Sequence, residues 1–348
     1  MHTIENTNLS EFDSHKFVGF IHDSNTGLNG YIAIHRGDSN RPSFGATRMW
    51  NYESQKDALK DALKLSRTMS YKAAMAGIKC GGAKAVIVGN GKSKKDRVAL
   101  LKSYAERINY LGGNFITGAD VGISRDDVIV MRRASPYFVG TKTEPVKYTA
   151  LGLLYSIHTC LKEINGSPEL TDRSFAIQGI GKVGEEMLRL IYPHSKKIYI
   201  SDIDDKKLSA AKRNYPKVKI TGIDEIYSKS VDIFCPCALS NCLNHKNISN
   251  LKCKVVVGGA NNQLENNSIG DLLYKIGILY APDYIVNAGG LISVYDEYEN
   301  GNYRTKRVKK KVKGIADTLE KVIKESKNKK ISTNESADKI AEQEFNDY

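Results

Sequence analysis

The chain has 348 residues, too many for one ordinary hydrophobic core and too few for three full domains, so we expect two domains. Its composition, 41% hydrophobic and 26% charged, excludes disordered and collagen-like proteins and is typical of a soluble globular protein. The formal net charge of +13 requires that nucleic acid be considered as a partner, but the lysine-rich tracts at 91–96 and 305–313 lack interleaved aromatic residues, which favours a solvated lysine-rich surface.

The N-terminal sequence and the cysteines bear on the location of the protein. Residues 1–15 are polar and partly acidic where a secretory signal is apolar, and no run reaches the roughly 18 apolar residues of a membrane-spanning helix, so we expect a cytoplasmic protein. The six cysteines are then expected to be reduced. Cys235, Cys237 and Cys242 lie close together, but they form no CxxC pair and no HxxxH is near, so we predict no metal site.

Residues 1–145 combine strand-like apolar runs with one amphipathic segment. The runs lie at 17–21, 31–35 and 83–89. Within residues 55–77, apolar residues recur at helical spacing while lysines occupy the opposite side. We therefore expect a helix there, with one buried and one solvated face.

The rest of the chain has two further patterns. Residues 146–285 alternate between strand-like and helix-like segments, which predicts a parallel sheet with crossover helices. Residues 286–348 have long helical periodicity, and we expect these helices to pack back on the first domain. The predicted fold class is α/β, with an N-terminal α/β domain, a doubly wound second domain and C-terminal helices.

A glycine-rich motif follows a strand-like run in the second region. Gly179, Gly181 and Gly184 form a GxGxxG pattern that encloses Lys182 and Val183, and a helical pattern follows it. Such glycines permit a tight turn and the close approach of a pyrophosphate, and the helix N-terminus supplies amide donors to the anion. The motif predicts that the doubly wound domain is of the Rossmann type and binds a dinucleotide.

An acidic residue ends the next strand-like run. Asp202 lies 18 residues after Gly184, where a carboxylate can accept hydrogen bonds from ribose hydroxyls and repel a 2′-phosphate. The cofactor is therefore predicted to be NAD, although Lys206 and Lys207 follow closely and soften the expected preference over NADP.

Three ionisable residues of the first region lie among small and apolar neighbours. These are Lys72, Lys84 and Asp120. A second cation and partial desolvation would lower the pKa of a lysine and make it a usable base. Taken one by one, the three residues also fit a helix lysine that extends to solvent, a strand-end lysine and a loop carboxylate. Their spacing does not show whether they converge.

A family resemblance bears on that question. The motifs FGATRMW, MSYKAAMAG, GGAKAVI, ADVG, QGIGKVG, SDID, PCAL, GGANNQL and YAPDYIVNAGG occur in this order over most of the chain. In that order they resemble the glutamate, leucine, phenylalanine and valine dehydrogenase family, most closely its leucine and phenylalanine branch. The resemblance implies that Lys72 holds the substrate carboxylate, that Lys84 is the catalytic lysine and that Asp120 assists proton transfer. It also implies that these residues line the cofactor cleft: Thr149, Cys237, Ala238, Leu239, Asn261 and Asn287.

The implied reaction is the oxidative deamination of an apolar L-amino acid to a 2-oxo acid and ammonia. Hydride would pass from the Cα atom to NAD, Lys84 would activate water and Asp120 would transfer protons to and from nitrogen. The resemblance further implies a homo-oligomer built through the first domain, which would also hold the catalytic residues. No membrane partner is expected.

The residues that match the family's side-chain pocket are all apolar or glycine. They are Phe44, Gly45, Met69, Gly118, Leu291 and Val294. A glutamate side chain would be desolvated and unpaired among them, so we expect glutamate to be a poor substrate. Leucine-type enzymes tend to have alanine at the position of Gly118, and the missing methyl group favours an aromatic or bulky apolar substrate, with branched-chain substrates next.

Two positions depart from the family pattern. Ala46 replaces the second glycine of the common GGTRM motif, and Ala119 replaces an acidic residue that leucine-type enzymes place before the catalytic aspartate. Because Lys72, Lys84 and Asp120 are unchanged, we expect an active enzyme. The alternative is a non-catalytic NAD-binding protein whose basic surface engages an acidic partner.

Overall fold

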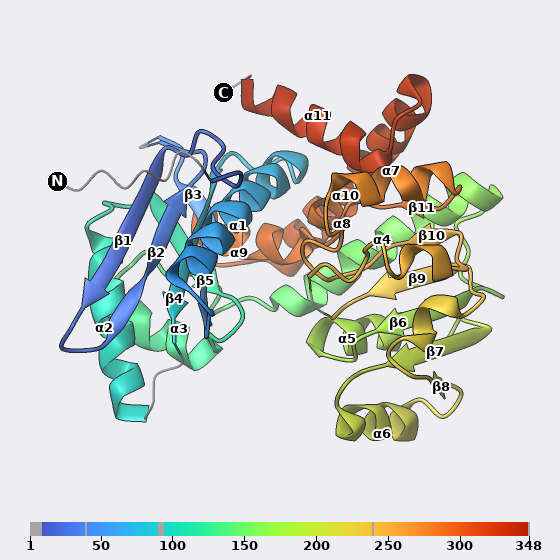
Figure 1. Cartoon of the computed structure of the whole chain (residues 1–348), viewed down its shortest axis with the longest axis horizontal. Coiled ribbons are helices and arrows are strands. Elements are labelled where there is room, and N and C mark those ends of the chain that lie inside the picture. Colours follow the sequence, from blue (N-terminus) through green and yellow to red (C-terminus); the bar gives the residue numbers. More distant parts are fainter. Residues whose placement is uncertain (1–8, 39, 90–93, 239, 347–348) are drawn as a thin grey trace. The chain divides into compact units, whose positions relative to one another are not determined.

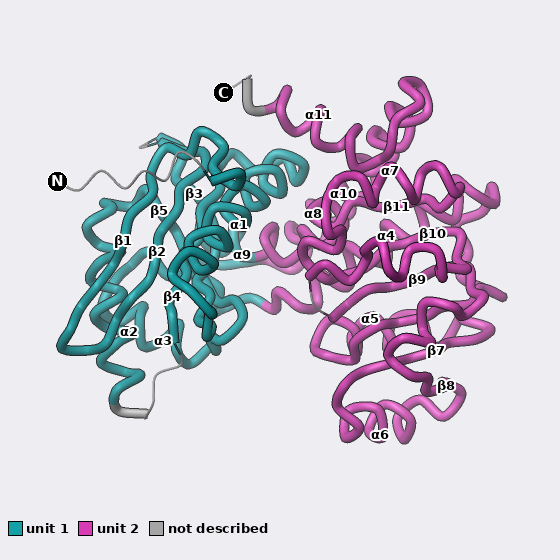
Figure 2. The backbone as a smooth tube through the Cα atoms, in the orientation of Figure 1, with its two compact units in different colours: residues 1–143, 294–303 teal, residues 144–293, 304–348 magenta. Residues whose placement is uncertain are grey.

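The computed structural model describes residues 9–38, 40–89, 94–238 and 240–346. The chain divides into two compact units (Figure 2): unit 1 comprises residues 1–143 and 294–303, and unit 2 comprises residues 144–293 and 304–348. Part of the lysine-rich tract at 91–96 lies outside the described residues. In the part of the chain that the structure describes, no helix is both long and apolar enough to cross a membrane.

Unit 1 is built on a five-stranded mixed sheet with the strand order β1-β2-β4-β3-β5 (Figure 1). Its strands are β1 (Phe17–Asp23), β2 (Leu28–Ile34), β3 (Ser43–Trp50), β4 (Gly81–Val88) and β5 (Phe115–Ala119). Its helices are α1 (Gln55–Met75), α2 (Lys94–Asn109), α3 (Arg125–Arg132) and the second half of α9 (Gly289–Asn300). β3 pairs in parallel with β4 on one side and with β5 on the other, and β2 is antiparallel to both of its neighbours.

The amphipathic segment of the first region forms α1, as predicted. Ser54 caps the helix by accepting a hydrogen bond from the Asp57 N–H group. Because strand side chains alternate between faces, successive residues of β4 enter different cores. Val86 packs with buried α1 residues on one face of the sheet, and Ile87 packs with α2 residues on the other. The sheet therefore has one face that α1 covers and a second face that α2 covers.

Unit 2 is built on a six-stranded parallel sheet with the order β11-β10-β9-β6-β7-β8. Its strands are β6 (Ser174–Gln178), β7 (Lys197–Ser201), β8 (Lys219–Ile220), β9 (Ile233–Pro236), β10 (Val255–Val256) and β11 (Leu279–Tyr280). Its helices are α4 (Pro145–Asn165), α5 (Lys182–Ile191), α6 (Asp205–Asn214), α7 (Asn267–Lys275), α8 (Asp283–Val286), the first half of α9, α10 (Thr305–Lys329) and α11 (Thr333–Asn346), with short 3₁₀ turns η2 (Glu225–Ser228) and η3 (Ile248–Asn250). The order reverses at β6, so the sheet is doubly wound.

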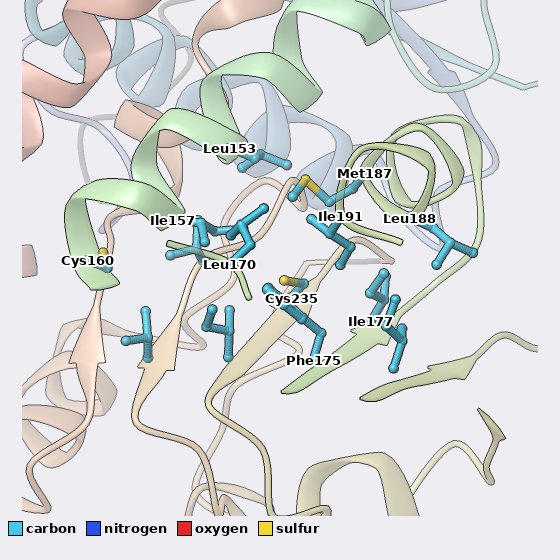
Figure 3. Packing of buried hydrophobic residues seen from close by; sticks show 14 of the residues in the cluster. Leu153, Ile157, Cys160, Leu170, Phe175, Ile177, Met187, Leu188, Ile191 and Cys235 are labelled. Atoms are coloured by element: carbon cyan, nitrogen blue, oxygen red, sulfur yellow. The ribbon is translucent and has the colours of Figure 1, made fainter. Parts of the chain in front are cut away.

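Both faces of the unit 2 sheet are buried. Figure 3 shows Phe175 and Ile177 of β6 packed with residues of α4 and α5, such as Ile157 and Met187. The intervening Ala176 belongs to a second core on the opposite face, formed with residues of η2 and α7. The predicted α/β fold with a doubly wound domain is confirmed.

The C-terminal helices differ from the expectation. Only residues 294–303 belong to unit 1, whereas α10 and α11 belong to unit 2. α10 packs on α4 and α11, and its residues Leu319 and Ile323 enter the same core as Ile157. Helical periodicity predicts that one face of a helix is buried, but it does not indicate which surface covers that face. The exposed lysines of α10, such as Lys306 and Lys310, agree with the predicted solvated surface.

Candidate active site

Three adjacent parallel strands position the ionisable residues of unit 1. Ala46 of β3 pairs with Lys84 of β4 on one side and with Gly118 of β5 on the other. Paired residues of neighbouring strands point to the same face, and here that face is the one that α1 covers. Asp120 directly follows the end of β5. Lys84, Ala46 and Gly118 therefore lie in one row across the three strands, on the same face of the sheet.

Lys84 and Asp120 form an ion pair between Nζ and Oδ2. The side chain of Lys84 is 6% exposed and that of Asp120 is 16% exposed, so the pair is largely shielded from water. Burial lowers the pKa of Lys84 and the nearby Arg48 cation lowers it further, while Asp120 acts in the opposite direction. Burial alone would raise the pKa of Asp120, but the Lys84 and Arg48 cations outweigh it and hold that pKa below its usual value.

Lys72 is buried on α1, the helix that lies over β4. The helix approaches the strand closely at Gly82, where a Cβ atom would lie 2.1 Å from the Ser70 backbone nitrogen. Lys72 follows that contact by two residues. Since Lys72 is only 8% exposed and Lys84 only 4% as whole residues, neither is a lysine that simply extends to solvent.

Two of the predicted substrate-pocket residues, Phe44 and Met69, lie on or beside the face of the sheet that α1 covers. Phe44 is buried two residues before Ala46, and its ring meets the rings of Tyr295 and Tyr298 edge to face at 5.2 and 4.9 Å. Met69, on α1, adjoins the close approach at Gly82. Gly45 differs, because it lies one residue from Ala46 and its missing side chain would point to the opposite face of the sheet.

The remaining pocket residues lie in β5 and in α9. A Cβ atom at Gly118 would lie 3.2 Å from the Val139 carbonyl oxygen, so glycine here also permits the close approach of the segment around Val139. The Val294 methyl groups lie beside Gly140, within 4.0 Å of the position of a Cβ atom. Leu291 is a partly buried residue of the unit 2 portion of α9.

In unit 2, the glycine-rich motif forms the turn from β6 to α5. Gly179 has a φ of +91°, which favours glycine, and a Cβ atom at Gly184 would lie 2.0 Å from the Gly179 carbonyl oxygen. Gly181 is the N-cap of α5, which begins with Lys182 and Val183. Among the described residues, no side chain caps these first amide groups and none lies within 4 Å of a Cβ atom at Gly181. The N-terminus of α5 is thus open to an anion.

Asp202 lies beside this turn, immediately after β7. Its Oδ2 atom accepts a hydrogen bond from the Ile180 N–H group at 2.7 Å, and its Oδ1 atom accepts one from the Asp204 N–H group at 2.9 Å. The carboxylate is therefore fixed next to the glycine-rich turn, where a ribose would follow a bound pyrophosphate.

Two other predicted cofactor residues, Cys237 and Ala238, directly follow the carboxyl end of β9. A Cβ atom at Gly179 would lie 2.9 Å from Ala238, and Cys237 lies beside Gly184. Leu239 lies outside the described residues, and the Thr149 hydroxyl donates to the Pro145 carbonyl oxygen on α4.

Asn287 provides a test of whether these residues fit a nicotinamide dinucleotide. Its Nδ2 atom donates to Asn261 Oδ1 at 3.0 Å. Its Oδ1 atom is buried and has no hydrogen-bond partner in the described part of the chain. A buried acceptor without a partner is costly, and the carboxamide of a nicotinamide ring could supply the missing donor. Together with the open N-terminus of α5, this acceptor fits such a cofactor.

The structure adds charged residues that the sequence analysis did not identify. Arg48 Nε donates to Asp120 Oδ2 at 3.1 Å, and Arg48 NH1 donates to Asp61 Oδ2 at 2.8 Å. The hydroxyl of Tyr52 donates to the same Asp61 oxygen at 2.5 Å. The signal in the sequence is a charged residue two positions after Ala46, in a run that is otherwise small or apolar.

A doubly wound domain with an open glycine-rich turn, in a chain that also buries a lysine–aspartate pair, is typical of a dinucleotide-dependent oxidoreductase. Comparison with known proteins specifies the class further. Residues 17–137 match the family described as Glu/Leu/Phe/Val dehydrogenase, dimerisation domain. Residues 199–346 match the family described as Glutamate/Leucine/Phenylalanine/Valine dehydrogenase. The chain belongs to this family and is an amino-acid dehydrogenase.

Individual relatives agree with the family assignment. The chain is 41% identical to the L-tryptophan dehydrogenase of Nostoc punctiforme over 94% of this chain and 92% of the relative. It is 36% identical to the leucine dehydrogenase of Bacillus cereus over 96% and 92%. A crystal structure of L-tryptophan dehydrogenase from Nostoc punctiforme has a TM-score of 0.81 at 40% identity and covers 96% of both chains. The hetero-hexameric glutamate dehydrogenase of Thermus thermophilus, with a TM-score of 0.77 at 18% identity over 94% and 87%, shows the fold alone.

The predicted family, its leucine and phenylalanine branch and the predicted reaction class are confirmed by these relatives. They give no support to the alternative of a non-catalytic binding protein. The roles assigned to individual site residues stay predictions.

Proposed function

We propose that this dehydrogenase catalyses the NAD-dependent oxidative deamination of an aromatic or branched-chain L-amino acid and the reverse reductive amination. The observation that carries the proposal is the buried Lys84–Asp120 pair, formed on a face of the sheet where Phe44 is also buried. Relatives named for tryptophan, leucine and phenylalanine support an apolar substrate class.

The chemistry assigns one task to each of three side chains. A bound dinucleotide would supply the acceptor for the hydride that leaves the substrate Cα atom. The Lys72 ammonium group binds the substrate carboxylate. Lys84, as the neutral amine, removes a proton from the water that attacks the resulting imine carbon. Asp120 transfers protons to and from the nitrogen atom that leaves as ammonia.

We expect aromatic and branched-chain L-amino acids to exceed glutamate in kcat/KM by about 100-fold or more, because a glutamate side chain would leave a carboxylate desolvated at a cost of about 3 kcal/mol or more. NADH formation should be measured for L-tryptophan, L-phenylalanine, L-leucine, L-valine and L-glutamate, with the D-enantiomers as controls. Gly118→Ala should lower the ratio of aromatic to aliphatic kcat/KM. Its unfolding temperature must be measured too, because the new methyl group would press on the Val139 carbonyl. A clear preference for glutamate would contradict the proposal.

The cofactor is proposed to be NAD because Asp202 lies beside the glycine-rich turn. We expect kcat/KM for NAD to exceed that for NADP by about 10-fold or more, since the carboxylate would repel a 2′-phosphate. Asp202→Ala should reduce the difference between the two cofactors. Asp205→Asn, an exposed acidic position on α6, serves as the matched control. Equal kcat/KM values for NAD and NADP in the unmodified enzyme would refute the assignment.

We also propose that copies of this chain associate through unit 1. The description of residues 17–137 as a dimerisation domain supports this proposal. A cytoplasmic location stays a prediction from the sequence.

A further inference from the structure

We propose that Arg48 is a positioning residue of this reaction, which keeps the Asp120 carboxylate ionised and directed at Lys84 while Lys84 is neutral. The inference rests on the proposed function and deepens it. Arg48 does not contact the substrate in this proposal, because its guanidinium acts through Asp120.

The strand order places Arg48 between the two catalytic residues. β3 lies between β4, which holds Lys84, and β5, which ends just before Asp120. Arg48 is two residues beyond Ala46 and therefore shares its face. Lys84 and Arg48 both donate to Asp120 Oδ2, Arg48 through Nε at 3.1 Å. One carboxylate oxygen is thus shared by two cations of different kinds.

The guanidinium is held at both ends. Its NH1 group donates to Asp61 Oδ2 at 2.8 Å, and Asp61 belongs to α1. Tyr52 donates to that same oxygen from the segment after β3, at 2.5 Å. The Arg48 side chain is only 15% exposed. A planar group fixed by carboxylates from two different elements has little freedom to turn, so it fixes the Asp120 carboxylate in turn.

The two cations differ in what they can do during turnover. Lys84 must lose and regain its proton to act as a base, whereas an arginine stays charged at any pH at which an enzyme is assayed. Each time Lys84 becomes neutral, Asp120 loses one cationic partner and retains Arg48. Without Arg48, Lys84 would be the one remaining ion-pair partner of the Asp120 carboxylate among the described residues, and its amine would hold its proton more strongly.

Charged residues from two elements shift the pKa of Lys84 in opposite directions. Arg48 from β3 disfavours the charged form of Lys84, and Asp61 from α1 favours it. Lys72 is a further buried lysine on α1. Tyr104, which contacts Thr47 and is buried on the opposite face of the sheet, carries no charge in the assay range because burial raises its pKa.

The test compares Arg48→Gln with Arg48→Lys and, as the matched control, with Arg107→Gln, a partly exposed arginine on α2 that pairs with Glu106. Two quantities are measured across pH: kcat and KM for the amino acid, and the rate of acetylation of the Lys84 amine in competition with an internal standard, read by mass spectrometry. Arg48→Gln should lower kcat by about 100-fold and change KM by less than about threefold. The acid limb of the pH profile of kcat should move to higher pH by about one unit, and so should the midpoint of the pH dependence of Lys84 acetylation. Arg107→Gln should leave all of these unchanged.

Each outcome decides the inference. If Arg48→Gln lowers kcat but moves neither the acid limb nor the acetylation midpoint, Arg48 only supports the fold and the proposal is overturned. If Arg48→Gln does not fold, Arg48→Lys provides the test, because lysine keeps the positive charge but loses the simultaneous hold on Asp120 and Asp61. The kcat of Arg48→Lys should fall about tenfold, while the acid limb of its pH profile stays at the same pH. An unchanged kcat would overturn the proposal. If no amino acid is turned over by the unmodified enzyme, the proposed function fails, while the acetylation midpoints still test Arg48.

Discussion

Lys84→Ala is expected to lower kcat for amino-acid oxidation by about 1,000-fold or more while leaving the affinity for NAD nearly unchanged. A positioned general base contributes about 100- to 10,000-fold, and among the described residues no other amine is paired with Asp120. The cofactor motif belongs to unit 2, whereas Lys84 belongs to unit 1, so NAD binding should not depend on the lysine. Turnover is measured as NADH formation at saturating substrate, and NAD affinity by calorimetric titration.

Lys79→Ala is the matched control for this variant. Lys79 is exposed and lies five residues before Lys84, so its loss changes the charge of the chain equally without touching Asp120. We expect Lys79→Ala to retain the full kcat. If Lys84→Ala also retained a kcat within tenfold of the unmodified enzyme, Lys84 would not be the base.

Periodicity and local motifs were sufficient to predict much of the fold. The apolar spacing within residues 55–77 predicts α1, and the glycine pattern at 179–184 predicts the turn from β6 into α5. Both features are local, because a helix and a helix-opening turn are formed by residues close together in the chain. The division of the last helices between the two units is not local. It depends on which exposed apolar surface each helix meets, and no spacing within α10 contains that information.

The contacts of the candidate site depend on strand order and register. Lys84 and Asp120 are 36 residues apart, and their contact requires that β3 lie between β4 and β5 with Ala46 opposite both Lys84 and Gly118. A parallel strand order is set by long-range packing, so it cannot be deduced from the run of residues in any one strand. The same limit explains why Arg48 was not predicted: its function follows from its position between the two residues rather than from its neighbours in the chain.

Asp120→Asn is expected to lower kcat by about 100- to 10,000-fold and to move the acid limb of kcat to lower pH. The amide has nearly the same shape as the carboxylate but cannot accept a proton, so proton transfer to and from the substrate nitrogen is lost. Asp120 raises the pKa of Lys84, and Arg48 lowers it. Removing the negative charge therefore lowers the pKa of Lys84, and because activity requires the neutral amine, the residual activity should persist to lower pH.

This shift is opposite in sign to the one expected for Arg48→Gln, and the two variants together separate the charges around Lys84. Asp126→Asn, at an exposed position in the first turn of α3, is the control. It should change neither kcat nor the acid limb of the pH profile of kcat. The residual activity is measured as NADH formation over long incubations, with Lys84 acetylation as the independent measure of its pKa. A limb that moved upward in Asp120→Asn would show that the carboxylate does not stabilise the charged form of Lys84. A kcat within tenfold of the unmodified enzyme would remove Asp120 from the proton-transfer step.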